Sequence, residues 1–228
     1  MTGYYISILH GAGLTALVAV LSLCVAIVLG MLGACAKLSG SRFLRTLGGL
    51  YALLVRGIPE LVLILLVFYG GAIGLNMLLE SMGSYEGISP DPLVAGVLII
   101  GFIYGAYMTE VFRGGIQSIP RGQLEAAWAF GLSRQATFWR ITLPQMVRYC
   151  VPSFTNSWMA LLKATSLVSL IGLQDMTYLA RQAGTATREP FMFILMVAGI
   201  YLVFTSISFW VLRKINDRYS LGADKVQL

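Results

Sequence analysis

Three ionisable residues interrupt stretches of this 228-residue sequence that are otherwise apolar, and the chemistry they offer is the recognition of charge. Glu60 and Glu110 supply carboxylates, and Lys163 supplies an ammonium group. A charge in an apolar environment is costly, so such groups usually face a cavity or a partner. The sequence places no deep Ser and His, paired Asp or metal-ligating set beside them. Binding is therefore favoured over catalysis.

Glu60 and Glu110 have different sequence neighbours. Glu60 follows Pro59 at the start of an apolar stretch, where its carboxylate can contact a cationic substrate or form an ion pair with Arg56 or Arg113. Both hypotheses remain open for Glu60. Glu110 lies three residues before Arg113, a spacing at which side chains pair on a helix surface. We therefore predict an ion pair for Glu110.

Lys163 lies about 13 residues into its apolar stretch, roughly 20 Å along a helix. At that depth its ammonium group cannot easily reach the membrane surface. It can attract the carboxylate of a substrate or neutralise a carboxylate of a partner subunit, and both hypotheses remain open. Thr165 and Ser166 are neighbouring hydroxyl donors in either case. Glu60, Lys163, Thr165 and Ser166 are the candidate residues of a substrate pathway.

A second group of residues lies in a polar, Arg-bearing segment, about residues 113–148. Glu125, Ala126 and Ala127 are followed after three residues by Gly131, and after nine more by I-T-L-P at 141–144. Small side chains at Ala126 and Ala127 would let another protein approach the backbone closely. Glu125 offers a charge for a partner's arginine or for local capping. The segment is suited to docking, and an ordinary amphipathic helix on the membrane surface is the alternative.

Local signals predict a helix–turn–helix in this segment. Pro120 suits the first turn of a helix, and Gly131 suits the left-handed position that ends one. Ser133 is placed to cap a second short helix that runs through Trp139. Pro144 is expected to end or bend that second helix.

Composition sets the class of protein. The chain is 57% hydrophobic and 11% charged, whereas soluble domains have about 25% charged residues. We therefore expect an all-α, polytopic integral membrane protein with one transmembrane domain over residues 1–228.

Residues 46–55 are apolar but too short to cross, so we expect a surface-lying or re-entrant segment there, and we expect loops at 80–91 and 174–189. Since a crossing helix needs about 20 residues, five spans are predicted, at about residues 11–36, 57–79, 92–112, 149–173 and 190–212.

Basic residues predict the orientation, because short loops rich in Lys and Arg stay cytoplasmic. Thirteen of the 16 basic residues fall on one side of the predicted topology, and Arg181 and Arg188 fall on the other. The N-terminus is therefore expected outside and the C-terminus inside. Anionic lipid headgroups suffice as partners for the net charge of +6, so no nucleic acid is expected.

The complete spacing of the polar segment resembles the coupling loop of the membrane-spanning subunits of bacterial ATP-binding-cassette (ABC) importers. Every fixed position of E-A-A, three residues, G, nine residues, I-x-L-P is met. R-G-I-P at 56–59, residues 105–113 and K-A-T-S-L-V-S-L-I-G at 163–172 look like the polar amino-acid uptake branch. Nearly the whole chain is covered. Within that branch it is most similar to the first (Q-type) permease subunit of histidine, lysine, arginine and ornithine importers and of related arginine and opine importers.

The resemblance implies a type I importer permease fold in the bacterial inner membrane and transport by alternating access. The implied partners are a second, homologous permease, two cytoplasmic ATPase subunits that bind the coupling loops, and a periplasmic solute-binding protein. Glu125, Ala126, Ala127 and Gly131 would then couple the chain to the ATPase.

The resemblance also implies that this chain is not an enzyme and carries no cofactor. The sequence contains no G-x-x-x-x-G-K-[ST] phosphate loop, so ATP and Mg would be bound by the partner ATPase. Glu60 stands where the wider branch more often has an apolar residue. That departure favours basic amino acids such as arginine, lysine, histidine and ornithine as cargo, with opines as the other candidate.

A passive channel, or a membrane scaffold that docks a soluble partner, is the alternative function. A channel should conduct without an ATPase, and this chain lacks an evident acidic ring or repeated filter loop. A scaffold would bind the ATPase but tolerate the loss of Glu60 and Lys163. An intramembrane enzyme is disfavoured by the lack of a catalytic constellation.

Overall fold

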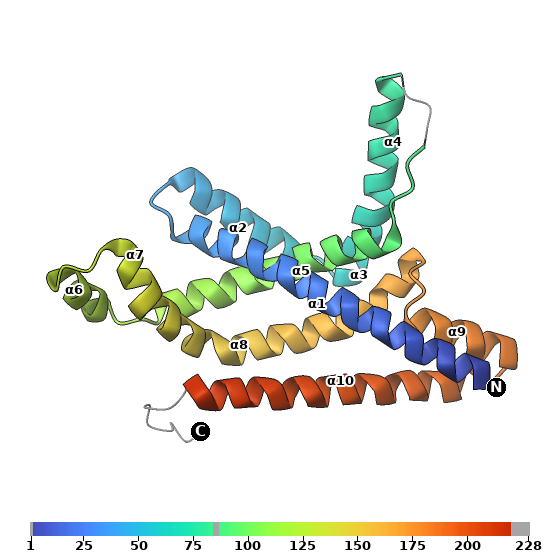
Figure 1. Ribbon diagram of the computed structural model, residues 1–228. Helices are drawn as coiled ribbons and strands as arrows, with labels where there is room; N and C mark the ends of the chain where they lie inside the picture. Colours follow the sequence, from blue (N-terminus) through green and yellow to red (C-terminus); the bar gives the residue numbers. More distant parts are fainter. Residues whose placement is uncertain (1, 84–86, 220–228) are drawn as a thin grey trace.

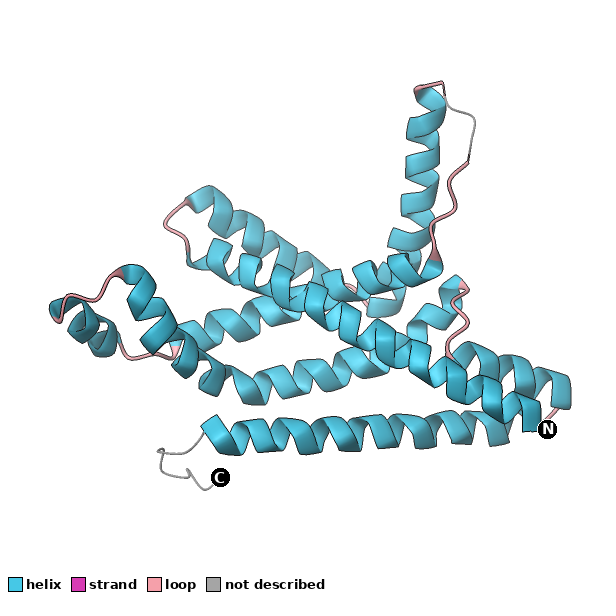
Figure 2. Ribbon diagram, in the orientation of Figure 1, coloured by secondary structure: helices cyan, strands magenta, loops and turns pink. Residues whose placement is uncertain are grey.

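The computed structural model describes residues 2–83 and 87–219, which form helices and short connections, without a strand among them (Figure 2). Four described helices are long and apolar enough to cross a membrane. They overlap four of the five predicted spans, although the second begins only at Glu60 because Pro59 interrupts the helix before it. The four are α1 (Thr2–Leu38), the composite helix Glu60–Ser81, α5 (Pro92–Gln117) and α10 (Pro190–Tyr219).

The predicted span at 149–173 corresponds to α8 (Leu143–Ala164) and the 3₁₀ helix Thr165–Ile171 that follows it. The 22 residues of α8 measure about 33 Å at 1.5 Å per residue, which matches a hydrocarbon core of about 30 Å. Its polar and basic side chains nevertheless exclude it from the four apolar helices. The fifth crossing therefore stays a prediction.

The short apolar segment at 46–55 belongs to a longer amphipathic helix, α2 (Arg42–Gly57). Gly48, Ala52 and Val55 are buried on the side that packs against α1 and α5, whereas Leu53 is 69% exposed on the other side. In Figure 1, α2 turns back beside the C-terminal part of α1.

Residues 174–189, expected to form a loop between two spans, are mostly helical. They contain α9 (Met176–Thr187), which packs against α1 and α10. Met176, Ala180 and Ala183 are buried in this contact. The polar residues between these three positions gave the segment the composition of a loop, but their helical spacing produces one apolar face.

The contact between α1 and α5 forms the centre of the molecule and depends on small residues. A Cβ at Gly33 would lie 2.2 Å from Oγ1 of Thr109, and a Cβ at Gly101 would lie 2.6 Å from Cβ of Val25. Glycines on both helices therefore let the backbones approach closely, as in small-xxx-small packing.

The composite helix Glu60–Ser81 consists of α3 (Glu60–Leu65), a π turn (Leu66–Gly70) and α4 (Gly71–Ser81). No residue of α4 is buried, and α4 projects away from the other helices in Figure 1. This apolar arm needs lipid or a second protein to cover it.

Candidate functional site

The predicted docking segment forms two short helices, α6 (Arg121–Ala129) and α7 (Arg134–Thr137), which protrude at one end of the molecule (Figure 1). The predicted left-handed turn is confirmed, since Gly131 has φ +78°. The amide of Leu132 donates to the carbonyl of Ala127 at 3.0 Å, and that of Gly131 donates to Trp128 at 2.9 Å. These two bonds form a Schellman motif, which fixes the end of α6.

The predicted cap of the second helix is also confirmed, because Oγ of Ser133 accepts a hydrogen bond from the amide of Ala136 at 3.2 Å. The second helix was expected to run through Trp139 and to end or bend at Pro144, and it does not end there. The backbone passes from α7 through a π turn (Phe138–Thr142) directly into α8, with Pro144 in its first turn. The π turn changes the backbone hydrogen-bond pattern just before Pro144, and the first turn of a helix tolerates the missing N–H of proline. The helix therefore continues.

The surface of the docking segment differs from the predicted one. Glu125 and Ala126 are exposed, but Ala127 is only 4% exposed and faces the interior of the segment. Ala127 therefore supports α6 rather than offering a surface to a partner. Exposed aromatic residues, which the sequence reasoning did not assign to docking, lie beside the motif: Trp128 is 51% exposed, Phe130 86% and Trp139 60%.

The structure tests one of the two hypotheses for Glu60, the ion pair. Its carboxylate accepts a hydrogen bond from the hydroxyl of Tyr104 at 3.0 Å, and it forms no ion pair with Arg56 or Arg113 within residues 2–83 and 87–219. Arg56 instead lies over the ring of Tyr107, 5.4 Å from its centroid. The ion-pair hypothesis for Glu60 is wrong in this structure.

The predicted ion pair of Glu110 is confirmed. Both Nε and Nη2 of Arg113 donate to Oε2 of Glu110, at 3.0 and 2.9 Å. The ammonium group of Lys37, at the end of α1, binds the other carboxylate oxygen. Sequence reasoning missed Lys37, which lies 73 positions from Glu110.

Lys163 and its two neighbours are only partly brought together. Lys163 and Ser166 line a groove of about 750 Å³ with Tyr201 and Thr205 of α10. Thr165 is fully buried, and its hydroxyl donates to the carbonyl of Leu162 at 2.7 Å. Thr165 therefore stabilises the helix junction and does not line that groove.

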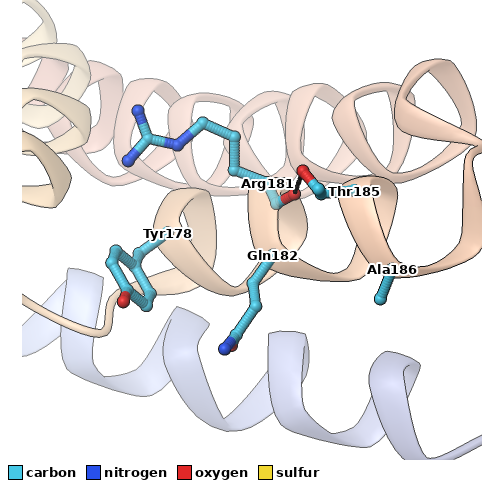
Figure 3. Close-up of a pocket in the computed structure, with 5 residues that line it drawn as sticks. All are labelled: Tyr178, Arg181, Gln182, Thr185 and Ala186. Carbon is cyan, nitrogen blue, oxygen red and sulfur yellow. Dashed lines mark hydrogen bonds between the residues drawn. The ribbon is translucent and has the colours of Figure 1, made fainter.

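The opposite end of the molecule carries a shallow hollow on α9 (Figure 3). Tyr178, Arg181, Gln182, Thr185 and Ala186 line it, and its volume is about 480 Å³. Gln182 and Tyr178 point toward the neighbouring helix, whereas Arg181 points to the other side of α9.

Asp175 is the fully buried cap of α9, and its Oδ1 accepts from the amide of Tyr178 at 2.9 Å. Burial raises the pKa of the Asp175 carboxyl, although the α9 amides act in the opposite direction. No group of three His, Cys, Asp or Glu side chains able to hold a metal ion occurs in the described part of the chain.

Several apolar helices and a protruding pair of short polar helices define a multi-pass membrane protein. Comparison with known proteins identifies its family. Residues 7–221 match the family described as binding-protein-dependent transport system inner membrane component, and the chain belongs to this family. It is therefore a permease subunit of an importer.

Individual relatives are similar to this chain in sequence over most of their length. The chain is 47% identical over 221 residues to the histidine/lysine/arginine/ornithine transport system permease protein HisQ of Salmonella typhimurium, covering 97% of this chain and 96% of that protein. It is 40% identical over 200 residues to the nopaline transport system permease protein NocQ of Agrobacterium fabrum, covering 87% and 85%. A crystal structure of an amino acid ABC transporter with histidines superposes with a TM-score of 0.80 at 27% identity, covering 96% of each chain.

Proposed function

We propose that this chain is the permease subunit of an ATP-driven ABC importer that carries basic amino acids or opines across the bacterial inner membrane. The observation that carries the proposal is the near full-length similarity to permeases named for histidine, lysine, arginine, ornithine and nopaline transport. The exposed docking segment supports it, since a driven transporter needs a surface for its motor. No observation favours a passive channel or a scaffold.

The proposed topology has five crossings, with the N-terminus outside. The arrangement of charge supports it: Lys37, Arg42 and Arg113 lie at the end of the molecule that carries α6, whereas Arg181 and Arg188 lie on or next to α9 at the other end. Cations at cytoplasmic ends are the usual pattern in membrane proteins. The α6 end is therefore proposed to face the cytoplasm.

The proposed partners follow from this topology. Two ATPase subunits dock on the α6 segments of this chain and of a second, homologous permease, and a periplasmic binding protein delivers cargo at the α9 end. ATP and Mg are bound by the ATPase. Closure of the ATPase pair moves α6, and the continuous helix from α7 through α8 transmits that movement to the transmembrane part. The docking contact must differ between the two states, because an equal contact shifts no equilibrium.

Glu60 is proposed to contact the cationic part of the cargo. The bond from Tyr104 fixes one carboxylate oxygen, and a partly buried carboxylate in a membrane protein is suited to bind a cation. Lys163 and Ser166, in the groove beside α10, are proposed as a second polar element of the pathway. Thr165 contributes by holding their helix junction.

Reconstitution tests this proposal. Proteoliposomes that contain the chain, its homologous permease and the ATPase, supplied with ATP and the binding protein, should accumulate arginine or histidine. Uptake should stop when the ATPase is inactivated. Equilibration of cargo without ATP would instead identify a passive channel, and ATPase binding without any uptake would identify a scaffold.

A further inference from the structure

Two opposite charges flank the break between α2 and α3. Arg56 lies in the last turn of α2, and Glu60 is the first residue of α3. Between them, Ile58 and Pro59 have extended backbone conformations. Proline has no N–H and disfavours helical geometry at the preceding residue, so the sequence itself imposes the break. A helix that stops here leaves both charged side chains beside α5.

Two stacked tyrosines of α5 position the two charges. The rings of Tyr104 and Tyr107 lie 5.4 Å apart at an angle of 28°. Tyr104 donates its hydroxyl hydrogen bond to Glu60, and the guanidinium carbon of Arg56 lies 5.4 Å from the centre of the Tyr107 ring. The stacked pair therefore holds a carboxylate at Tyr104 and a guanidinium group at Tyr107, about one helical turn apart on α5.

Arg56 has binding capacity left unused by this contact. No Asp or Glu within residues 2–83 and 87–219 pairs with Arg56, although its guanidinium group has five N–H donors. It lines a groove of about 770 Å³ together with Tyr107, Lys37 and Glu110. Lys37 is engaged by Glu110, so Arg56 is the available cation of this groove in the described structure.

We propose that Arg56 is a substrate-binding residue whose guanidinium group binds the α-carboxylate of the transported amino acid, while Glu60 binds its cationic end. This inference rests on the proposed function. A guanidinium group matches a carboxylate through two parallel hydrogen bonds, and a neighbouring carboxylate complements an ammonium or guanidinium group. Arg56 would thus distinguish amino acids from amines that have the same side chain.

Agmatine, which is arginine without its α-carboxylate, is the probe for this contact. The complete permease–ATPase complex is prepared in lipid nanodiscs without ATP or binding protein, and the binding of arginine and agmatine is measured. The intact complex should bind arginine about 10- to 100-fold more tightly than agmatine. The substitution Arg56→Gln should abolish this preference by weakening arginine binding alone. Arg56→Lys, which keeps the charge but not the planar fork, should leave an intermediate preference.

A matched control is Arg45→Gln, since Arg45 is an exposed arginine of the same helix outside the groove, and it should bind as the wild type does. An unchanged arginine preference in Arg56→Gln would overturn the inference. If the Arg56→Gln complex loses bound anionic lipid but still prefers arginine over agmatine, the partner of Arg56 is a lipid headgroup. If the two permeases of the variant complex dissociate, Arg56 pairs instead with a carboxylate of the second permease. Either result overturns the proposal. A wild-type complex that neither binds nor imports amino acids contradicts the proposed function instead.

Discussion

Gly131 offers the sharpest test of coupling, because its role depends on backbone conformation alone. Its φ of +78° lies in the left-handed region, and its amide and that of Leu132 close the end of α6. A Cβ at this position would meet no atom within 4 Å. The Cβ of the substitution Gly131→Val therefore introduces no collision, and we expect the main effect to come from the disfavoured backbone conformation.

The size of the effect follows from that conformation. The left-handed region costs a side-chain-bearing residue about 1–2 kcal/mol, and a β-branched residue pays at the upper end. A cost of this size lowers the population of the correctly closed segment about 5- to 30-fold relative to open alternatives. The transmembrane helices do not depend on this turn, so we expect normal insertion and assembly of the Gly131→Val subunit.

The assay compares ATP hydrolysis and cargo uptake in proteoliposomes of the complete complex. Gly131→Val should hydrolyse ATP with little dependence on binding protein and should lose most uptake. Gly131→Asn is the matched control, since asparagine adopts the left-handed region at a lower cost, and it should retain most uptake. Normal coupled uptake by Gly131→Val would refute the assignment of this turn to coupling.

Three further predictions concern other parts of the molecule. Phe130→Ser should reduce co-purification of the ATPase without lowering the thermal stability of the isolated permease, because this ring is 86% exposed. Unchanged co-purification would show that the Phe130 ring does not contribute to docking. Gly33→Ala should lower the melting temperature of the purified permease, because the new Cβ would lie 2.2 Å from Oγ1 of Thr109. The control Gly13→Ala should not lower it, since a Cβ at Gly13 has no atom within 4 Å. Equal melting temperatures of the two variants would contradict the close α1–α5 contact. Asp175→Ala should destabilise α9 by about 1 kcal/mol through loss of its cap, and the α9 amides should then exchange hydrogen faster. The control Asp175→Asn should preserve the protection of these amides from exchange. Unchanged exchange in the alanine variant would show that the cap is dispensable.

Local patterns in the sequence predicted what local physics determines. Apolar length located four helices, the spacing of Glu110 and Arg113 predicted their ion pair, and the glycine at 131 predicted a left-handed turn. Each of these depends on residues that are close in the sequence. The predicted cap at Ser133, whose hydroxyl oxygen accepts from an amide three residues later, is of the same kind.

Contacts between distant segments could not be predicted in this way. Lys37 and Glu110 are 73 positions apart, and Glu60 and Tyr104 are 44 apart, so only the packing of α1, α3 and α5 brings them together. The burial of Ala127 likewise follows from the packing of α6 against α7 and the π turn Phe138–Thr142. Helix α9 was missed because its polar residues outnumber the apolar ones that form its buried face.

The activity proposed for this chain is ATP-driven import of a cationic amino acid through a pathway that includes Glu60. The most direct measurement is uptake and ATP hydrolysis by the reconstituted complex with its binding protein, for wild type and Glu60→Gln, against arginine, histidine and glutamine. The wild-type complex should carry the basic substrates in an ATP-dependent manner. Glu60→Gln should lose their uptake while the binding protein still stimulates ATP hydrolysis. Wild-type uptake that does not need ATP would contradict driven import, and unchanged arginine uptake by Glu60→Gln would contradict a cargo contact at Glu60.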